Sequence, residues 1–321
     1  MRGRRRDALP LSPVRCTGRI EGDSERGTSM LMYLAFRGGA LLTRAIPLRV
    51  SYAVARAIGL LAYLAWPGGR RRCVANMARV TGGDEKAARR LARRSFGNYL
   101  VYLVDFVRFL RTDAAEVDRR VVWDGWSGLQ AERRGNGIVF VTMHFGNWDL
   151  GAAILAQKGF PISVIADTFE NGPVNRLVLG SREHLGMKVI AAERMGPGIL
   201  RALRGNDVVA VLIDVPQATD GVEVEFFGER IAVPDGPARI ALRAGSSVMA
   251  ATLPRVDPWG DIVTVNVAPV PFTPTGNQEA DVRGLTQAVF RQLEQFVRRD
   301  PSQWYIFRSL WVADLARAAR P

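Results

Sequence analysis

Cysteine, histidine and lysine are all scarce in this sequence of 321 residues, which has two cysteines, two histidines and only three lysines among its 44 basic residues. Cys16 and Cys73 form no Cys-x-x-Cys pair, which argues against a disulfide framework and against a Cys/His zinc site. We therefore expect no metal and no cofactor, in a chain suited to a reducing compartment.

Several common catalytic motifs are also missing. The sequence has no G-x-S-x-G nucleophile elbow, no G-x-x-x-x-G-K-[ST] phosphate loop, and no G-x-G-x-x-G after a strand. A serine hydrolase of the usual kind, a P-loop enzyme and a dinucleotide-binding enzyme are therefore disfavoured.

Near the N-terminus the sequence lacks an uncharged run long enough to span a bilayer. The longest such run, Ala57 to Gly69, has 13 residues, whereas a spanning helix needs about 20. Arginines recur seven residues apart in the 31–66 region, in the pairs Arg37/Arg44 and Arg49/Arg56. This spacing predicts two amphipathic helices that lie in a membrane interface, although two core-packing helices would show a similar pattern.

Positive charge is abundant, with a net charge of +13. Such a balance favours anionic partners, namely nucleic acid, anionic lipid surfaces or phosphorylated small molecules. Because the basic residues are dispersed and no nucleic-acid-reading motif is present, we expect no nucleic-acid partner. The amphipathic pattern of 31–66 favours membrane lipids as partners.

The first 29 residues contain seven arginines and no sustained apolar periodicity. MRGRRRD is followed by no apolar segment, so we do not interpret it as a secretion signal. We expect residues 1–29 to be disordered, or the true start to be Met30 or Met32.

From residue 137 onward, short apolar runs alternate with helical patterns. The strands predicted from these runs cover 137–144, 161–166, 187–191, 207–213, 247–254 and 261–270, with a hairpin or bent strand at 221–233. The predicted helices cover 149–158, 173–185, 197–204 and 278–299, another begins after Asp235, and two helical stretches precede them at 84–111. This predicts an α/β fold whose mixed, mostly parallel sheet is flanked by helices, with a helical membrane-associating region at 30–119 and an α/β domain at 120–321.

The segment His144-Phe145-Gly146-Asn147-Trp148-Asp149 lies where a predicted strand ends and a helix begins. In open α/β sheets this carboxyl end of a strand is where ligands bind. Asp149 could fold back onto the imidazole of His144, and such a pair could deprotonate an alcohol for attack on a thioester. A histidine at a strand end can also be an ordinary hydrogen-bonded core residue.

Four blocks of sequence carry a family resemblance. HFGNWD (144–149) resembles the His-x-x-x-x-Asp/Glu block of the lysophospholipid acyltransferase superfamily. RRRCVAN (70–76) resembles a block of the lipid A late acyltransferases, and DPSQWYIFR (300–308) with Trp311 resembles a C-terminal signature that they share with the phosphatidylinositol mannoside acyltransferases. LID (212–214) with GVEVEFFGERIAVPDGPARIALRAG (221–245) resembles the phosphatidylinositol mannoside acyltransferases. Together the blocks extend over about residues 45–315.

This resemblance implies O-acyl transfer from acyl-CoA or an acyl carrier protein to a membrane lipid, without an acyl-enzyme, by a peripheral protein on the cytoplasmic face of the membrane. His144 would be the base and Asp149 its orienting partner or a structural acid, with Asp214 as a second candidate for orienting the base. We expect a monomer and a glycolipid acceptor with a phosphatidylinositol mannoside-type sugar. A lysophospholipid, a lipid A-type acceptor, and a thioesterase on the same pair stay open as alternatives.

Further residues are candidates for binding substrate. Arg176 and Arg182, six residues apart on a predicted helix, suit the phosphates of CoA or of the lipid. Asn147 and Glu170 are close enough in sequence to contribute to the site. His184, in a polar helix end, is interpreted as a surface residue.

Overall fold

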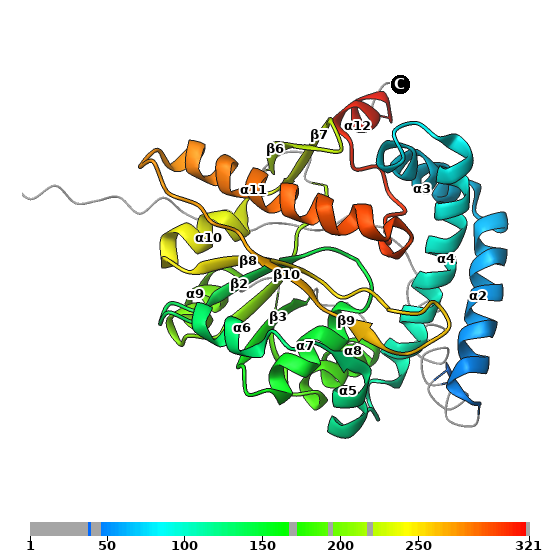
Figure 1. The fold of residues 1–321 in the computed structure, drawn as a ribbon, viewed down its shortest axis with the longest axis horizontal. Coiled ribbons are helices and arrows are strands. Elements are labelled where there is room, and N and C mark those ends of the chain that lie inside the picture. The colour runs from blue at the N-terminus through cyan, green and yellow to red at the C-terminus, as the bar shows by residue number, and fades with distance from the viewer. Residues whose placement is uncertain (1–37, 40–45, 167–171, 192–194, 217–220, 319–321) are drawn as a thin grey trace, which may run out of the picture.

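A six-stranded sheet forms the centre of the protein (Figure 1). The computed structural model describes residues 38–39, 46–166, 172–191, 195–216 and 221–318. In sheet order the strands are β10 (Asn266–Pro269), β8 (Ser247–Thr252), β2 (Ile138–Thr142), β5 (Val208–Leu212), β3 (Ile162–Ala166) and β4 (Lys188–Ala191). All neighbours are parallel except β10, which runs antiparallel to β8. The predicted mixed, mostly parallel sheet is thus confirmed.

Helices cover both faces of the sheet. One face carries α9 (Met195–Arg204), α10 (Gly236–Ala244), α11 (Gln278–Arg299) and the hairpin of β6 (Gly221–Phe226) and β7 (Glu229–Pro234). The other face carries α5 (Ala114–Arg120), α6 (Trp126–Glu132) and α7 (Trp148–Gln157), and α8 (Gly172–His184) joins β3 to β4. The remaining short elements are β1 (Val121–Val122), β9 (Val263–Thr264), η2 (Pro301–Gln303) and α12 (Val312–Ala318).

The central strand β2 is buried along its whole length because it packs against helices on both faces. Its side chains alternate between the two sides. Val139 and Val141 belong to the core under α10 and α11, whereas Ile138 and Phe140 belong to the core under α7. This burial on both faces explains why the strand is a continuous apolar run in the sequence.

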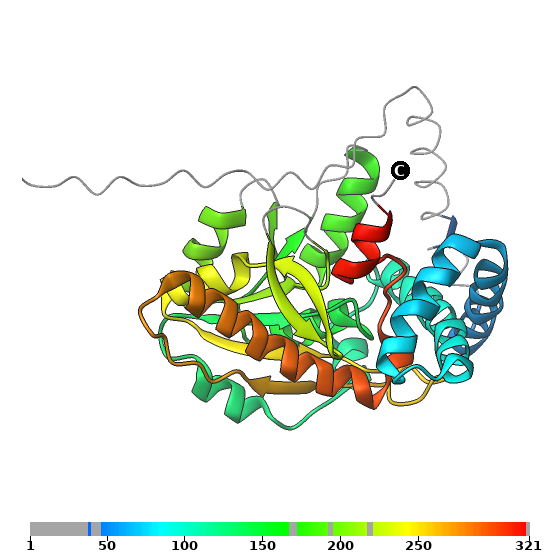
Figure 2. The same ribbon diagram turned by 90° about the horizontal axis from the view of Figure 1, so that it is seen from above.

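Three helices at the N-terminal end form a layer beside the sheet: α2 (Leu48–Ala65), α3 (Pro67–Val80) and α4 (Glu85–Arg108) (Figures 1 and 2). The outermost, α2, packs against α4 through two glycines, and a Cβ atom on Gly59 would lie 2.6 Å from the Cα atom of Gly97. Met77 of α3 and Phe96 of α4 belong to the same buried cluster as residues of the sheet. The helical layer and the sheet therefore share a core.

The structure corrects several predicted elements. The two helical stretches expected in 84–111 form one continuous helix, α4. Gly97 does not interrupt this helix and allows its close contact with α2. The strand expected at 261–270 is two short strands, β9 and β10, in different sheets. The helix expected after Asp235 is α10; the Asp235 side chain does not cap it and pairs with Arg239 at 2.5 Å. Of the two interfacial helices expected in 31–66, the second corresponds to α2, and most of the first lies outside the described residues, as do residues 1–29.

A buried charge cluster around Asp105 of α4 joins the helical layer to the rest of the protein. The carboxylate lies 2.8 Å from Arg120 of α5 and 2.6 Å from Arg255, which follows β8. It also accepts hydrogen bonds from Tyr52 of α2 at 2.5 Å and from Asn147 at 2.8 Å. Burial alone would raise the pKa of Asp105, but the two guanidinium groups outweigh it and hold this pKa below its usual value.

Replacing Asp105 by asparagine should strongly destabilise the protein, because two buried arginines would lose their carboxylate. We expect a loss of about 3–5 kcal/mol in the free energy of unfolding, measured by chemical denaturation. The control is Asp118→Asn, whose exposed ion pair with Lys158 should contribute less than about 1 kcal/mol. The pKa of Asp105 is lowered in the folded state. The extra free energy of unfolding of the wild type over Asp105→Asn should therefore be complete above the unfolded-state pKa of about 4, and it should disappear as the pH falls through the folded-state pKa. Equal losses for the two variants would contradict this role.

Candidate active site

The parallel pairing of β2 with β5 places His144 beside Asp214. Thr142 and Leu212 are register partners at the ends of these strands, and each functional residue follows two positions later. The Nδ1 atom of His144 lies 2.8 Å from a carboxylate oxygen of Asp214. A residue after β2 and a residue after β5 therefore meet at the carboxyl edge of the sheet.

Asp214 is fully buried and hydrogen-bonded on several sides. Besides the imidazole, it accepts bonds from the backbone N–H of His144 at 3.0 Å and from the indole N–H of Trp304 at 3.0 Å. Burial alone would raise the pKa of Asp214, but the interaction with His144 lowers it below its usual value. The carboxylate therefore stays ionised and fixes the orientation of the ring.

The imidazole of His144 is only partly buried, with 31% of its side chain exposed. Since Nδ1–H donates to Asp214, Nε2 is left as the proton acceptor on the open side. Burial lowers the pKa of His144, but the negative charge of Asp214 outweighs burial and raises the pKa above its usual value. This arrangement suits a general base whose protonated form is stabilised.

The C-terminal segment holds the turn that carries His144. Tyr305 donates its backbone N–H to the carbonyl of His144 at 2.7 Å, and Gly146 donates to the carbonyl of Gln303 at 2.9 Å. The backbone at Gly146 has a φ of 62°, and a Cβ atom there would lie 1.9 Å from the carbonyl oxygen of Leu253. Only glycine fits this position.

Asp149, predicted to orient the imidazole, lies in the first turn of α7 and contacts other groups. Its carboxylate accepts a hydrogen bond from Tyr102 at 2.7 Å and pairs with Arg182 at 2.8 Å. Among the described residues it makes no hydrogen bond to His144. Tyr102 in turn stacks on Trp148 at 4.0 Å between ring centroids, and Trp148 lies edge-on to His144 at 5.3 Å. Asp149 therefore supports the wall of the site, and Asp214 occupies the position beside the base.

A small apolar cavity shares one residue, Trp148, with the surroundings of His144. Trp148, which contacts His144, also lines this cavity, which lies between α6, α7 and the sheet and has a volume of about 50 Å³. Other lining residues are Trp123, Trp126, Phe140, Ile154 and Leu155. One side chain, Trp148, therefore both contacts His144 and lines the cavity.

With this geometry in view, comparison with known proteins identifies the family. The model of the bacterial lipid A biosynthesis acyltransferases matches residues 25–313. The chain belongs to this family. It is therefore an acyltransferase enzyme, as the sequence resemblance predicted.

Similar proteins of known activity narrow the comparison. The phosphatidylinositol mannoside acyltransferase of Mycolicibacterium smegmatis (strain ATCC 700084 / mc(2)155) is 29% identical over 298 residues, which are 89% of this chain and 93% of the relative. That of Mycobacterium tuberculosis (strain ATCC 25618 / H37Rv) is 30% identical over 303 residues, which are 89% of this chain and 90% of the relative. These relatives support acyl transfer to a glycolipid.

The four blocks that carried the resemblance meet in space. Asn76 of α3 donates to the carbonyl of Arg308 at 2.9 Å and accepts from the indole of Trp311 at 2.9 Å. Phe226 of the β6–β7 hairpin packs edge-on against Trp304 at 5.6 Å, and Trp304 bonds Asp214. The family motifs therefore pack together around the His144–Asp214 pair, and Phe226 fills core.

The proposed substrate-binding residues fall in different places. Asn147 is buried and uses both polar groups internally, since it caps α7 through Leu150 N–H at 3.1 Å and donates to Asp105. Arg182 is engaged with Asp149, whereas Arg176 is exposed on α8. Glu170 lies outside the described residues. His184 is exposed at the end of α8, in agreement with its interpretation as a surface residue.

Sequence reasoning missed Tyr102 and Arg308. Tyr102 comes from α4, a helix assigned to another region, so no local pattern linked it to Asp149. Arg308 is exposed, and its positive charge opposes the rise in the pKa of His144. The C-terminal block contained Arg308, but only the tertiary structure brings its charge to the base.

Replacing Gly146 by alanine should displace the catalytic turn. The matched control is Gly82→Ala, because Gly82 has a similar φ of 64° but nothing within 4 Å of an added Cβ atom. The control should cost about 1 kcal/mol of backbone strain, whereas Gly146→Ala should cost at least about 2 kcal/mol more and lower the rate of acyl transfer. Denaturation and activity assays on both variants measure the difference, and equal stabilities would show that the turn tolerates a side chain.

Proposed function

We propose that the protein transfers a long fatty acyl group from a thioester, acyl-CoA or acyl carrier protein, to a sugar hydroxyl of a phosphatidylinositol mannoside-type glycolipid at the cytoplasmic face of the membrane. The observation that carries this proposal is the His144–Asp214 pair, which is open to solvent on one side and contacts Trp148, a residue that lines an apolar cavity.

The chemistry needs one base and no protein nucleophile. Nε2 of His144 removes the proton of the acceptor hydroxyl while the hydroxyl oxygen attacks the thioester carbonyl carbon. The tetrahedral intermediate then collapses with cleavage of the carbon–sulfur bond, and the proton on the imidazolium passes to the departing thiolate. Asp214 stabilises the imidazolium between these steps, as its effect on the pKa of His144 indicates.

The apolar cavity supports an acyl chain as the transferred group. Its lining is formed by tryptophan, leucine, isoleucine, alanine and phenylalanine side chains with hardly any polar surface, which suits a hydrocarbon and not a polar group. Trp148 links the cavity to the base. At about 50 Å³ the cavity has room for only a few carbons of such a chain, and Trp148 brings that part of the chain near His144.

The decisive experiment is thiol release from palmitoyl-CoA and from palmitoyl carrier protein, with and without glycolipid, lysophospholipid and lipid A-type acceptors. We expect release to require a mannosylated phosphatidylinositol and to fall by at least about 100-fold in His144→Ala. His184→Ala, which removes the chain's second histidine from an exposed position, is the matched control and should retain activity. Release without any acceptor would identify a thioesterase, and full activity in His144→Ala would refute the assigned base.

The pH dependence should report the His144–Asp214 interaction. Since Asp214 raises the pKa of His144 and the base acts in its neutral form, kcat/KM should rise with pH and level off above a midpoint higher than about 6.5. In Asp214→Asn the effect of burial remains without the carboxylate, so the midpoint should move to lower pH and the plateau should fall by about 100-fold or more. Asp118→Asn should leave the midpoint unchanged. A midpoint that does not move in Asp214→Asn would exclude Asp214 as the partner of the base.

A further inference from the structure

Exposed apolar side chains are concentrated on one side of the protein. Ten large apolar side chains are exposed in the described part of the chain, and nine of them lie on two neighbouring segments. Seven belong to α2 and the residue after it: Val50, Val54, Ile58, Leu60, Leu61, Leu64 and Trp66. Two belong to the loop between β8 and β9, here called the 254–261 loop: Val256 and Trp259. The tenth is Val122.

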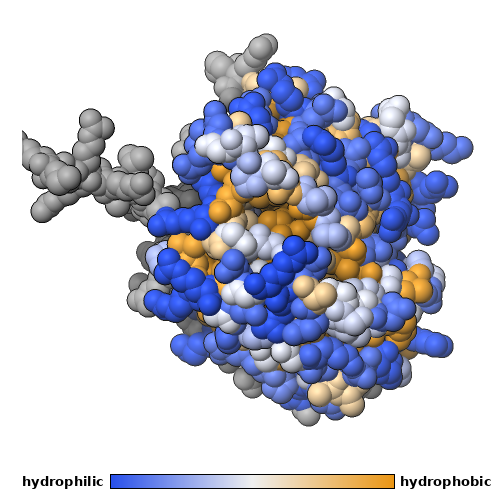
Figure 3. Space-filling view, turned by 60° about the vertical axis from the view of Figure 1, so that its left-hand side comes forward, coloured by the Kyte–Doolittle hydropathy of each residue, from blue (hydrophilic) through white to orange (hydrophobic). Residues whose placement is uncertain are grey.

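The opposite side of the molecule differs. In Figure 3, which turns the end away from α2 toward the viewer, hydrophilic residues cover most of the surface and hydrophobic ones gather around a hollow. The exposed large apolar side chains of the described residues are nevertheless concentrated on α2 and the 254–261 loop, and a patch of this kind marks an interaction site.

The outward face of α2 is apolar along its length. Exposed side chains at Val50, Val54, Leu61 and Leu64 follow the spacing of one helix face. By length and composition alone α2 could cross a membrane, but its 18 residues extend only about 27 Å. Crossing would also separate Tyr52 from Asp105 and Gly59 from Gly97. An orientation in the membrane plane keeps both contacts.

The 254–261 loop is held firmly at its base while its tip is exposed. Arg255 is nearly buried and bonds Asp105 at 2.6 Å and the carbonyl of Gly260 at 2.8 Å. Arg56 of α2 donates to the carbonyl of Pro258 and lies 4.8 Å above the ring of Trp259. Nevertheless Val256 is 61% and Trp259 58% exposed. A tryptophan held outward beside an apolar helix is typical of a membrane-interface anchor.

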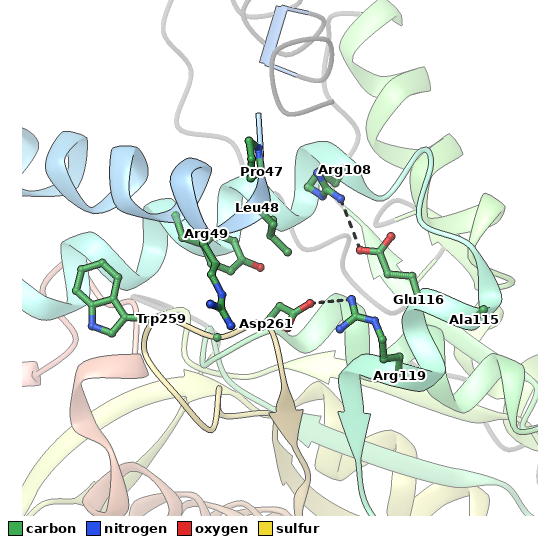
Figure 4. A pocket seen from close by; sticks show the side chains of 11 residues that line it. Pro47, Leu48, Arg49, Arg108, Ala115, Glu116, Arg119, Trp259 and Asp261 are labelled. Carbon is green, nitrogen blue, oxygen red and sulfur yellow. Dashed lines mark hydrogen bonds and ion pairs between the residues drawn. The ribbon is translucent and has the colours of Figure 1, made fainter. Parts of the chain in front are cut away.

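Arginines lie at both ends of the apolar face. A hollow of about 630 Å³ opens between the start of α2, α5 and the 254–261 loop, and its lining includes Arg49 and Arg119 (Figure 4). Arg119 pairs with Asp261 at 2.8 Å, whereas Arg49 is exposed and pairs with no acidic side chain in the described part of the chain. Arg71 is exposed just beyond the other end of α2. Cations in these positions complement the phosphates of anionic lipid headgroups.

We infer that α2 and the 254–261 loop together form a docking surface for an anionic phospholipid bilayer, with α2 lying in the membrane plane and Trp259 as a second anchor. Arg49 faces a headgroup phosphate at the hollow. This inference rests on the proposed function only in that the acceptor is a membrane lipid. Because the Asp105 cluster joins Tyr52 of α2 and Arg255 of the loop to Asn147, three residues after His144, the docked surface has a fixed orientation relative to the base.

Sedimentation of the full chain with phosphatidylcholine vesicles, with or without phosphatidylglycerol, tests the surface. We expect tighter binding when phosphatidylglycerol is present. Trp259→Ala should weaken binding to both vesicle types by about tenfold. Arg49→Gln should weaken binding by about fivefold, and only to the anionic vesicles.

Two matched controls lie outside the surface. Val122, outside the surface, is 60% exposed, and Val256, on the 254–261 loop, is 61% exposed. Val256→Ser should weaken vesicle binding, whereas Val122→Ser should not. Arg291→Gln, on the exposed side of α11, controls for the loss of charge in Arg49→Gln. The melting temperature of each variant verifies that it is folded.

Several outcomes would overturn the inference. The first is vesicle binding that is unchanged in Trp259→Ala. The second is an equal loss of vesicle binding in Val122→Ser and Val256→Ser. The third is a wild-type protein that binds no vesicles and forms a dimer that dissociates in Trp259→Ala. His144→Ala should bind vesicles like the wild type. Absent vesicle binding with intact acyl transfer to detergent-dispersed acceptor would refute this surface alone, and intact binding without acyl transfer would refute the proposed function alone.

Discussion

The interactions of the buried Asp105 carboxylate hold the helical layer and the turn after His144 in their relative positions. The carboxylate joins α2 through Tyr52, α5 through Arg120, the segment after β8 through Arg255, and the catalytic turn through Asn147. A buried ion is costly unless it is paired and fully hydrogen-bonded, so these partners are constrained to one geometry. The same group therefore fixes the outer helical layer and the turn that carries His144.

The second constraint is the register of the parallel sheet. The pairing of Thr142 with Leu212 places the two residues that follow β2 and β5 side by side. His144 and Asp214 consequently meet although 70 residues separate them. The C-terminal segment completes the site, because Trp304 bonds Asp214 and Tyr305 bonds the carbonyl of His144. The geometry of the base thus comes from three distant segments that pack together.

Much of the fold could be predicted from local pattern. The bounds predicted for the helix at 278–299 match those of α11, and the predicted strands at 137–144 and 207–213 contain β2 and β5, because burial on both faces leaves continuous apolar runs. Local pattern could not separate Asp149 from Asp214. Asp149 is close to His144 in sequence, but its carboxylate bonds Tyr102 and Arg182. Likewise Trp259 belongs to no periodic segment, so nothing in the sequence indicated that it is exposed beside α2.

The sequence by itself determined the family, the α/β class and His144 as the candidate base, because these depend on local blocks and on hydrophobic periodicity. The tertiary structure decided which acid faces the imidazole, which arginines are engaged internally, and which apolar side chains are exposed together. These properties depend on strand order and on contacts between segments far apart in the chain. Periodicity along one segment contains no information about them.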